Sequence, residues 1–189
     1  MGRHRTIDRE AVLDAAERVV MRAGAAHLTL DAVAAEAGIS KASVLYDYKS
    51  KRALIGAVIE RRVGTEERKI QAFIDTEAGK PDADIRGRLA AASRSSSEED
   101  RSVALNLCVA LAQDAELRGP VQKSLQDTLS AIAASSTHPR GAMLAFLAIE
   151  GLTLLDWFGL LSFPEPERDR LIAEIGWLIG QSPGALPQA

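Results

Sequence analysis

A chain of 189 residues can bury a sizeable core, and its 47% hydrophobic but only 4% aromatic composition, rich in Ala and Leu, favours helices over a sandwich or barrel. The net charge of -3 hides an asymmetry. Residues 1–62 contain eleven Lys/Arg and eight Asp/Glu, whereas residues 63–189 contain twelve Lys/Arg and eighteen Asp/Glu. A phosphate group would therefore be attracted to the N-terminal part and repelled by the rest. The single cysteine, Cys108, excludes a disulfide framework and a multi-cysteine zinc site, and no apolar run reaches the ~18 residues of a membrane span. We therefore expect an all-α, cytoplasmic protein that needs no membrane.

The first predicted helix follows a short basic arm, Gly2-Arg3-His4-Arg5. Asp8 can accept backbone N–H bonds as its N-cap, and Gly24 can close it in a left-handed conformation. Between them apolar residues recur at helical spacing: Val12, Ala15, Ala16, Val19 and Val20.

Two short helices are predicted next, on either side of a tight turn. Thr29 caps the first, which stops at Gly38, and Ser40 caps the second, which runs from Lys41 to about Tyr48. Ile39 alone separates Gly38 from Ser40. Two helices can cross this closely if the contact residue is small, the turn accepts a positive φ and the inner faces are apolar. Ala34 and Gly38 meet the first two demands, and the apolar set is Val33, Ala37, Ile39 and Val44.

A helical pair of this kind presents the N-terminal part of its second helix to a DNA major groove about 12 Å wide. Lys and Ser can hydrogen-bond to bases, Ala and Leu can touch a thymine methyl group, and lysines with free helix N–H groups suit phosphates. The predicted DNA-binding residues are Thr29, Ser40, Lys41, Ala42, Ser43, Leu45, Tyr46, Lys49 and Lys51. The alternative is an ordinary helical hairpin whose lysines are simply solvated.

The run from Leu28 to Lys51 resembles the signature of tetracycline-repressor (TetR) family regulators, and the similarity covers residues 8 to about 60. The resemblance implies base contacts at Lys41–Ser43, phosphate contacts at Tyr46 and Lys51, and a capping role for Thr29 beside the phosphates. The chain departs from the family at two positions. Leu45 stands where an aromatic residue is usual, and Asp47 where histidine is common. Either the operator differs, or these two positions face elsewhere.

A fourth helix, capped by Ser50, is predicted to run to about residue 75. It would link the N-terminal helices, called the head, to the helices that follow, called the body. Further helices are expected near residues 82–94, 101–113, 117–134, 139–161 and 166–180, which gives about nine in total. We expect a helix-turn-helix DNA-binding domain over residues 1–62, a helical effector-binding and dimerisation domain over 63–180, and a flexible tail over 181–189.

The role of the body follows mainly from the resemblance, which implies ligand binding and a homodimer formed by the last two long helices. Residues 139–161 and 166–180 are apolar nearly all round, more than burial on one side requires. Pairing with a second chain explains this surplus, and a monomeric core is the alternative.

A small hydrophobic effector is expected to bind within the body and to release operator DNA. Candidate lining residues are Leu105, Cys108, Leu111, Met143, Phe146, Leu147, Glu150 and Trp157. Plain core packing is the alternative for each of them except Glu150. A carboxylate in an apolar helix needs a partner, either a ligand or a buried arginine.

Catalysis is not expected, because the three histidines, His4, His27 and His138, are paired with no nucleophile or metal-ligand pattern. No metal or cofactor is expected. Two alternatives to a ligand-responsive repressor remain, a redox-responsive regulator acting through Cys108 and an architectural DNA-binding protein without a ligand.

Overall fold

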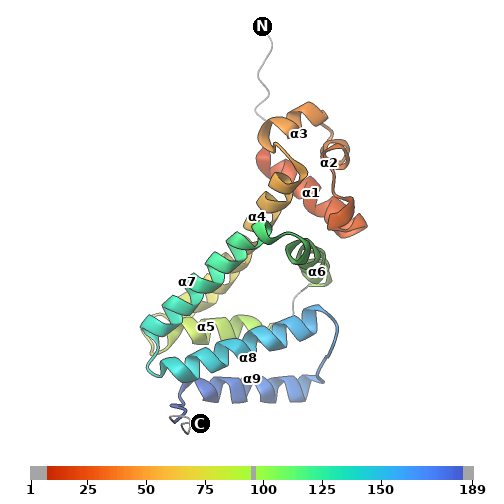
Figure 1. Cartoon of the computed structure of the whole chain (residues 1–189). Coiled ribbons are helices and arrows are strands. Elements are labelled where there is room, and N and C mark those ends of the chain that lie inside the picture. Colours follow the sequence, from red (N-terminus) through yellow and green to blue (C-terminus); the bar gives the residue numbers. More distant parts are fainter. Residues whose placement is uncertain (1–7, 95–96, 185–189) are drawn as a thin grey trace, which may run out of the picture. The chain divides into compact units, whose positions relative to one another are not determined.

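The computed structural model describes residues 8–94 and 97–184, and within these ranges the chain forms helices and no strand (Figure 1). The predicted basic arm at Gly2–Arg5 and residues 185–189 of the predicted tail lie outside the described residues. The helices are α1 (Arg9–Ala23), α2 (Leu30–Ala37), α3 (Lys41–Asp47), α4 (Lys51–Thr76), α5 (Ala83–Ala92), α6 (Glu98–Gln113), α7 (Gly119–Ser135), α8 (Pro139–Trp157) and α9 (Glu165–Ile179). Short 3-10 turns cover Ala25–His27 and Ala115–Arg118. The all-α prediction is confirmed, and no helix in the described part of the chain is both long and apolar enough to cross a membrane.

The described chain divides into two compact units. The first comprises the residues up to Val63 together with Ser97–Val121, and the second comprises the rest. The long helix α4 is continuous through position 63 and so supplies residues to both units. These units differ from the predicted domains because α6 and the 3-10 turn after it pack with the N-terminal helices, although they lie far along the chain.

The core of the first unit is built on α1. Asp8 accepts hydrogen bonds from the backbone N–H groups of Glu10 and Ala11, so the helix starts where the sequence predicts. The five apolar residues predicted for its inner face are all buried. Residues that other helices contribute to this core include Val33, Val44, Leu54, Val58 and Leu107.

The second unit is organised around the hairpin of α8 and α9. Phe146 and Ile149 of α8 pack with Ile175 and Ile179 of α9. The two helices approach closely at Gly141, where an added Cβ would lie 2.4 Å from the carbonyl oxygen of Leu178. A residue near the start of α8 therefore meets the end of α9, and the pair is antiparallel.

Several boundaries differ from those predicted. Helix α6 begins at Glu98 and not at residue 101, because the Ser97 hydroxyl accepts a hydrogen bond from Asp100 N–H and caps the helix there. Helix α8 ends at Trp157 and not at residue 161, because Gly159 adopts a positive φ of 60°. Gly24 does have a positive φ, 81°, but its ψ of 160° lies outside the left-handed helical region that was predicted.

Candidate nucleic-acid interface and ligand cavity

The turn between α2 and α3 has the predicted geometry. Gly38 is left-handed, with φ 66° and ψ 31°, and the N–H groups of Gly38 and Ile39 donate to carbonyls in the last turn of α2. The Thr29 hydroxyl accepts from Ala32 N–H, and the Ser40 hydroxyl accepts from Ser43 N–H. These caps fix both helix starts, and Val33 and Val44 fill the space between the helices.

Helix α3 keeps one face to the core and leaves the other open. Val44 points inward and is fully buried, whereas the Tyr46 side chain is 74% exposed and Leu45 is 43% exposed. Lys41 and Ala42 are exposed as well, and Ser43 is half-buried with its hydroxyl 2.8 Å from that of Ser40. Of the residues predicted to contact bases, Lys41, Ala42, Leu45 and Tyr46 are thus exposed along α3, and Ser43 is partly accessible.

The lysines around this surface are held only by exposed contacts. Lys41 Nζ lies 2.8 Å from Asp31 Oδ2, and both side chains are more than half exposed. The Lys49 ammonium bonds to the Tyr46 carbonyl oxygen and lies 5.0 Å from the centre of the Tyr46 ring. Lys51 Nζ donates to the carbonyl oxygen of Ala26 at 2.6 Å. Exposed pairs of this kind contribute little free energy, so these ammonium groups can move to a phosphate or a base.

The two departures from the family signature have different environments. Asp47 is turned away from the open face, because its carboxylate pairs with Arg9 Nε at 3.4 Å and is only 15% exposed. It is therefore not an exposed negative charge beside the predicted phosphate contacts. Leu45, by contrast, is accessible and can offer only apolar contact.

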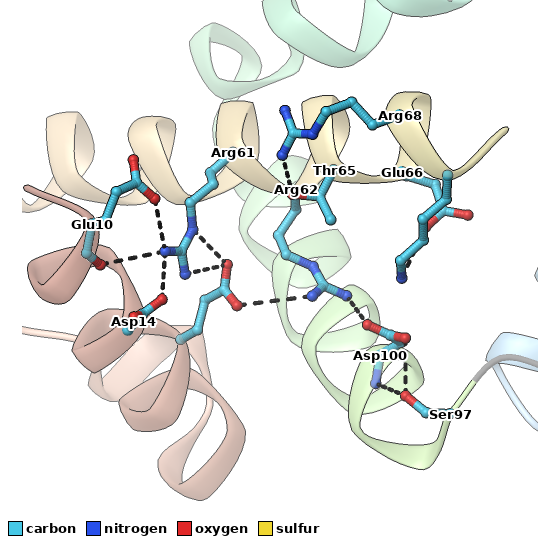
Figure 2. A network of polar contacts seen from close by, with 11 residues as sticks. Glu10, Asp14, Arg61, Arg62, Thr65, Glu66, Arg68, Ser97 and Asp100 are labelled. Carbon is cyan, nitrogen blue, oxygen red and sulfur yellow. Dashed lines mark hydrogen bonds and ion pairs between the residues drawn. The ribbon is translucent and has the colours of Figure 1, made fainter. Parts of the chain in front are cut away.

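Ion pairs hold α2 and α4 against α1. Arg18 and Arg22 of α1 hydrogen-bond to Glu36 of α2 at 2.8 and 3.0 Å, and these bonds lower the pKa of the Glu36 carboxyl. On α4, Arg61 contacts Glu17 at 2.8 Å and Asp14 at 2.6 Å (Figure 2). The helices that support α3 are therefore held together by ion pairs as well as by apolar packing.

The same network reaches α6. Arg62 lies next to Arg61 on α4 and pairs with Asp100 at 2.6 Å, in the first turn of α6 (Figure 2). Asp100 also bonds to Ser97, whose hydroxyl caps that helix. Ion pairs at Arg61 and Arg62 thus connect α1, α4 and α6 within the first unit.

The second unit contains a cavity of about 130 Å³ between α4, α5, α8 and α9. Its lining combines apolar side chains with six charged ones. The residues are Glu66, Ile70, Arg88, Ala91, Ala92, Arg94, Ile149, Glu150, Thr153, Asp156, Trp157 and Arg168. Glu150 is half-buried, and burial raises the pKa of its carboxyl, with opposing influence from the charge of Arg88.

Only two of the eight predicted ligand-binding residues, Glu150 and Trp157, line this cavity. Phe146 is buried in the core of its unit, and Leu147 is 58% exposed on the surface. Met143 is half-buried but is not among the lining residues. Three others lie on α6 and so belong to the first unit: Leu105, Cys108 and Leu111. Burial raises the pKa of the Cys108 thiol, which disfavours the reactive thiolate.

Most of the lining was not predicted from sequence. One signal was present, because Glu150, Thr153 and Trp157 follow one another at helical spacing on α8 and form a partly polar stripe on an apolar helix. Glu66 and Arg88 come from other helices and carry no comparable local signal. A wider groove of about 400 Å³ in the first unit is less suited to a ligand group, because its charged residues, Lys51, Arg52 and Asp114, are already bonded to protein partners.

Helix α8 also carries an apolar stripe on its outer side. Leu144, Leu147, Leu154 and the following Phe158 are exposed, and with Gly151 they recur at alternating intervals of three and four residues. This is the spacing at which helices pair in coiled coils. An added Cβ at Gly151 would meet nothing within 4 Å, so the middle of this α8 stripe is open.

The short α2–turn–α3 unit with its accessible second helix defines a helix-turn-helix DNA-binding protein. Two family models match the chain. The model of the bacterial regulatory proteins, tetR family, matches residues 12–58. The model of the tetracyclin repressor-like C-terminal domain matches residues 85–179. The chain therefore belongs to the TetR family of transcriptional regulators, as its sequence motif predicts, and it is not an enzyme.

Solved structures share this fold over nearly their whole length. A Streptomyces coelicolor A3(2) protein assigned as a transcriptional regulator is 17% identical, with a TM-score of 0.76 and coverage of 92% of this chain and 98% of that chain. A TetR-family member from Streptomyces coelicolor A3 is 23% identical, with a TM-score of 0.68 and coverage of 88% and 96%. The multidrug binding protein EbrR, complexed with malachite green, is 22% identical, with a TM-score of 0.72 and coverage of 92% and 99%. A search of the curated proteins returned no match.

Proposed function

We propose that this regulator is a repressor that binds a palindromic operator as a homodimer and is released by a small hydrophobic effector. The observation that carries the proposal is the accessible N-terminal surface of α3, held by the Gly38 turn. Because the target is DNA, we expect the protein to work in the cytoplasm.

The α3 surface supports reading of the major groove. Lys41 and Ser43 can hydrogen-bond to base edges, and Leu45 can contact a thymine methyl group. Lys49 and Lys51 stand beside this surface, where phosphate contacts would set the register of the protein on the duplex.

The α8 stripe supports pairing with a second copy. Exposed leucines at coiled-coil spacing leave water when two such stripes meet, and Gly151 allows close approach of the helices. On α9, Trp177 is 65% exposed and adds a large apolar surface. A two-fold dimer would present two α3 helices to half-sites about 34 Å apart.

The cavity of the second unit supports an effector role. Helix α4 supplies Glu66 and Ile70 to the cavity and Leu54 and Val58 to the core beneath the DNA-binding surface. If α4 has one arrangement that suits DNA and another that does not, a ligand that prefers one of them would change the affinity for DNA. EbrR, which shares the fold, is a multidrug binding protein that was crystallised with malachite green, and this also favours a ligand-responsive regulator.

Selection of bound sequences from random DNA tests the proposal most directly. We expect an inverted repeat whose half-sites are centred about one helical turn apart. Mobility shifts on that site, with a panel of small hydrophobic compounds, should then identify ligands that weaken binding. A selected site without two-fold symmetry would contradict dimeric operator binding, and DNA affinity that no compound alters would contradict effector release.

A redox-responsive regulator is less well supported. The raised pKa of the Cys108 thiol keeps it protonated, and a protonated thiol reacts slowly with oxidants. Replacement of Cys108 by Ser should leave DNA binding insensitive to peroxide treatment, as in the parent protein.

A further inference from the structure

The cavity in the second unit also indicates the charge of its ligand. We infer that the cavity binds a small organic cation, in which a protonated amine is attached to an apolar body of about one ring. The ammonium group of this ligand pairs with Glu150. The inference rests on the proposed effector role.

Two of the three carboxylates that line the cavity are free to accept, whereas the third, Glu66, pairs with Lys69 at 3.6 Å. Among the described residues, neither Glu150 nor Asp156 has a side-chain hydrogen bond or ion pair. Arg88 is the opposite charge that acts on Glu150, and its guanidinium is already 2.8 Å from Asp84 Oδ1. A half-buried carboxylate without a bonded partner costs free energy, and a cationic ligand would remove that cost.

Two of the three arginines of the cavity, by contrast, already donate to protein partners, and the third lies over an aromatic ring. Arg88 pairs with Asp84, and Arg168 donates to the carbonyl oxygens of Ala92 and Ser93 at 2.7 and 3.1 Å. The Arg94 guanidinium lies over the ring of Phe73 at 5.8 Å. The cavity therefore offers acceptors more readily than donors, and it fits a cation better than a carboxylate or phosphate ligand.

The size and walls of the cavity limit the apolar body. Its volume of about 130 Å³ is below the ~300–1,000 Å³ of most ligand pockets and close to the ~150 Å³ that holds a benzene molecule. Ile70, Ile149 and Trp157 supply apolar contact, and the indole face of Trp157 also attracts cations. A ligand with one ring and one ammonium group matches these features.

Three probes of nearly equal size separate the effect of charge from that of shape. Benzylamine is cationic at neutral pH, benzyl alcohol is neutral and benzoate is anionic. Binding to the full chain can be followed by the fluorescence of Trp157 in a Trp177→Phe background, whose oligomeric state is checked against the parent. We expect benzylamine to bind at least tenfold more tightly than benzoate, with benzyl alcohol between them.

Substitution then tests the role of Glu150. Glu150→Gln keeps the shape of the side chain and should weaken benzylamine binding by about tenfold to a hundredfold, while benzyl alcohol binding stays the same. Glu165→Gln, an exposed glutamate in the same unit, is the matched control and should change neither. If Glu150→Gln fails to fold, Asp156→Asn and the probe series on the parent protein still decide the question, because Asp156→Asn should also weaken benzylamine selectively.

The inference is overturned if benzoate binds as tightly as benzylamine, if no probe binds, or if Glu150→Gln leaves benzylamine affinity unchanged. Operator binding is measured separately. Selective, Glu150-dependent binding of benzylamine without any change in DNA affinity supports this inference and contradicts effector release.

Discussion

At the scale of single residues, Lys41 and Lys51 occupy different positions relative to the α3 surface. Lys41 stands at the N-terminus of α3, whereas Lys51 starts α4 and bonds to the main chain at Ala26. We predict that Lys41→Ala weakens operator binding by about 1–3 kcal/mol and relaxes the preference at one base pair. Lys51→Ala should weaken all sequences equally and reduce the salt dependence. Titrations on operator and scrambled DNA at several salt concentrations distinguish these outcomes, and equal behaviour of the two variants would refute base reading by Lys41.

Gly38 is a second residue with a measurable role. Its φ of 66° is unfavourable for any residue with a Cβ, yet a Cβ there would meet nothing within 4 Å. Gly38→Ala should therefore lower the free energy of unfolding by about 1–2 kcal/mol through backbone strain alone. Gly64→Ala is the matched control, since that glycine lies inside α4 and an added Cβ would meet only the end of the Arg68 side chain, at 3.5 Å. It should be neutral or slightly stabilising, and urea denaturation of both variants measures the difference.

Glu150 should influence stability as well as binding. Its pKa in the folded protein is raised above the ordinary 4.5, so the folded state favours the protonated form. The stabilisation from this preference is present below pH 4.5 and is lost as pH rises through the folded pKa. We predict that Glu150→Gln is at least as stable as the parent at neutral pH, and that its advantage shrinks as the solution is acidified towards pH 4.5. Thermal melts across this range test the sign, and an advantage that grows on acidification would contradict it.

At the scale of helices, the sequence predicted the head better than the cavity. Local residues determine where the head helices begin and end, and the caps at Asp8, Thr29 and Ser40 and the turn at Gly38 all formed as expected. The cavity depends on helices that meet only in the folded chain, so Glu66 and Arg88 could not be placed beside Glu150 from spacing alone. The same reason explains why the packing of α6 against the N-terminal helices was not predicted.

The ion pairs of α4 lead to a prediction about this element. Burial lowers the pKa of Arg61, but hydrogen bonds to Glu17 and Asp14 outweigh burial and raise it overall. The Arg61 and Glu17 side chains are both only 16% exposed, so loss of the guanidinium leaves a poorly solvated carboxylate. We expect Arg61→Leu to destabilise the protein by about 1–3 kcal/mol in urea denaturation. Arg170→Leu is the control, because the pair it breaks with Glu174 is exposed to solvent and should contribute much less to stability.

At the scale of the whole molecule, the α8 stripe determines the expected assembly. Leu147→Glu places a charge within the stripe, where pairing would bury it without a partner. The variant should therefore be monomeric and bind the operator much more weakly. Leu125→Glu changes an exposed leucine of α7 outside the stripe and should remain dimeric. Light scattering after size-exclusion chromatography reports the mass of each. A dimeric Leu147→Glu variant would show that copies associate through another surface.

The brevity of α3 sets an upper limit on how much sequence one subunit can read. Seven helical residues rise about 10 Å, which is the length of roughly three stacked base pairs. A selected operator should therefore show about three strongly constrained pairs in each half. The rest of the sequence specificity would come from the spacing between the half-sites and from how easily the intervening duplex deforms. A single base pair inserted at the centre should therefore reduce operator affinity more than many mismatches in the outer positions.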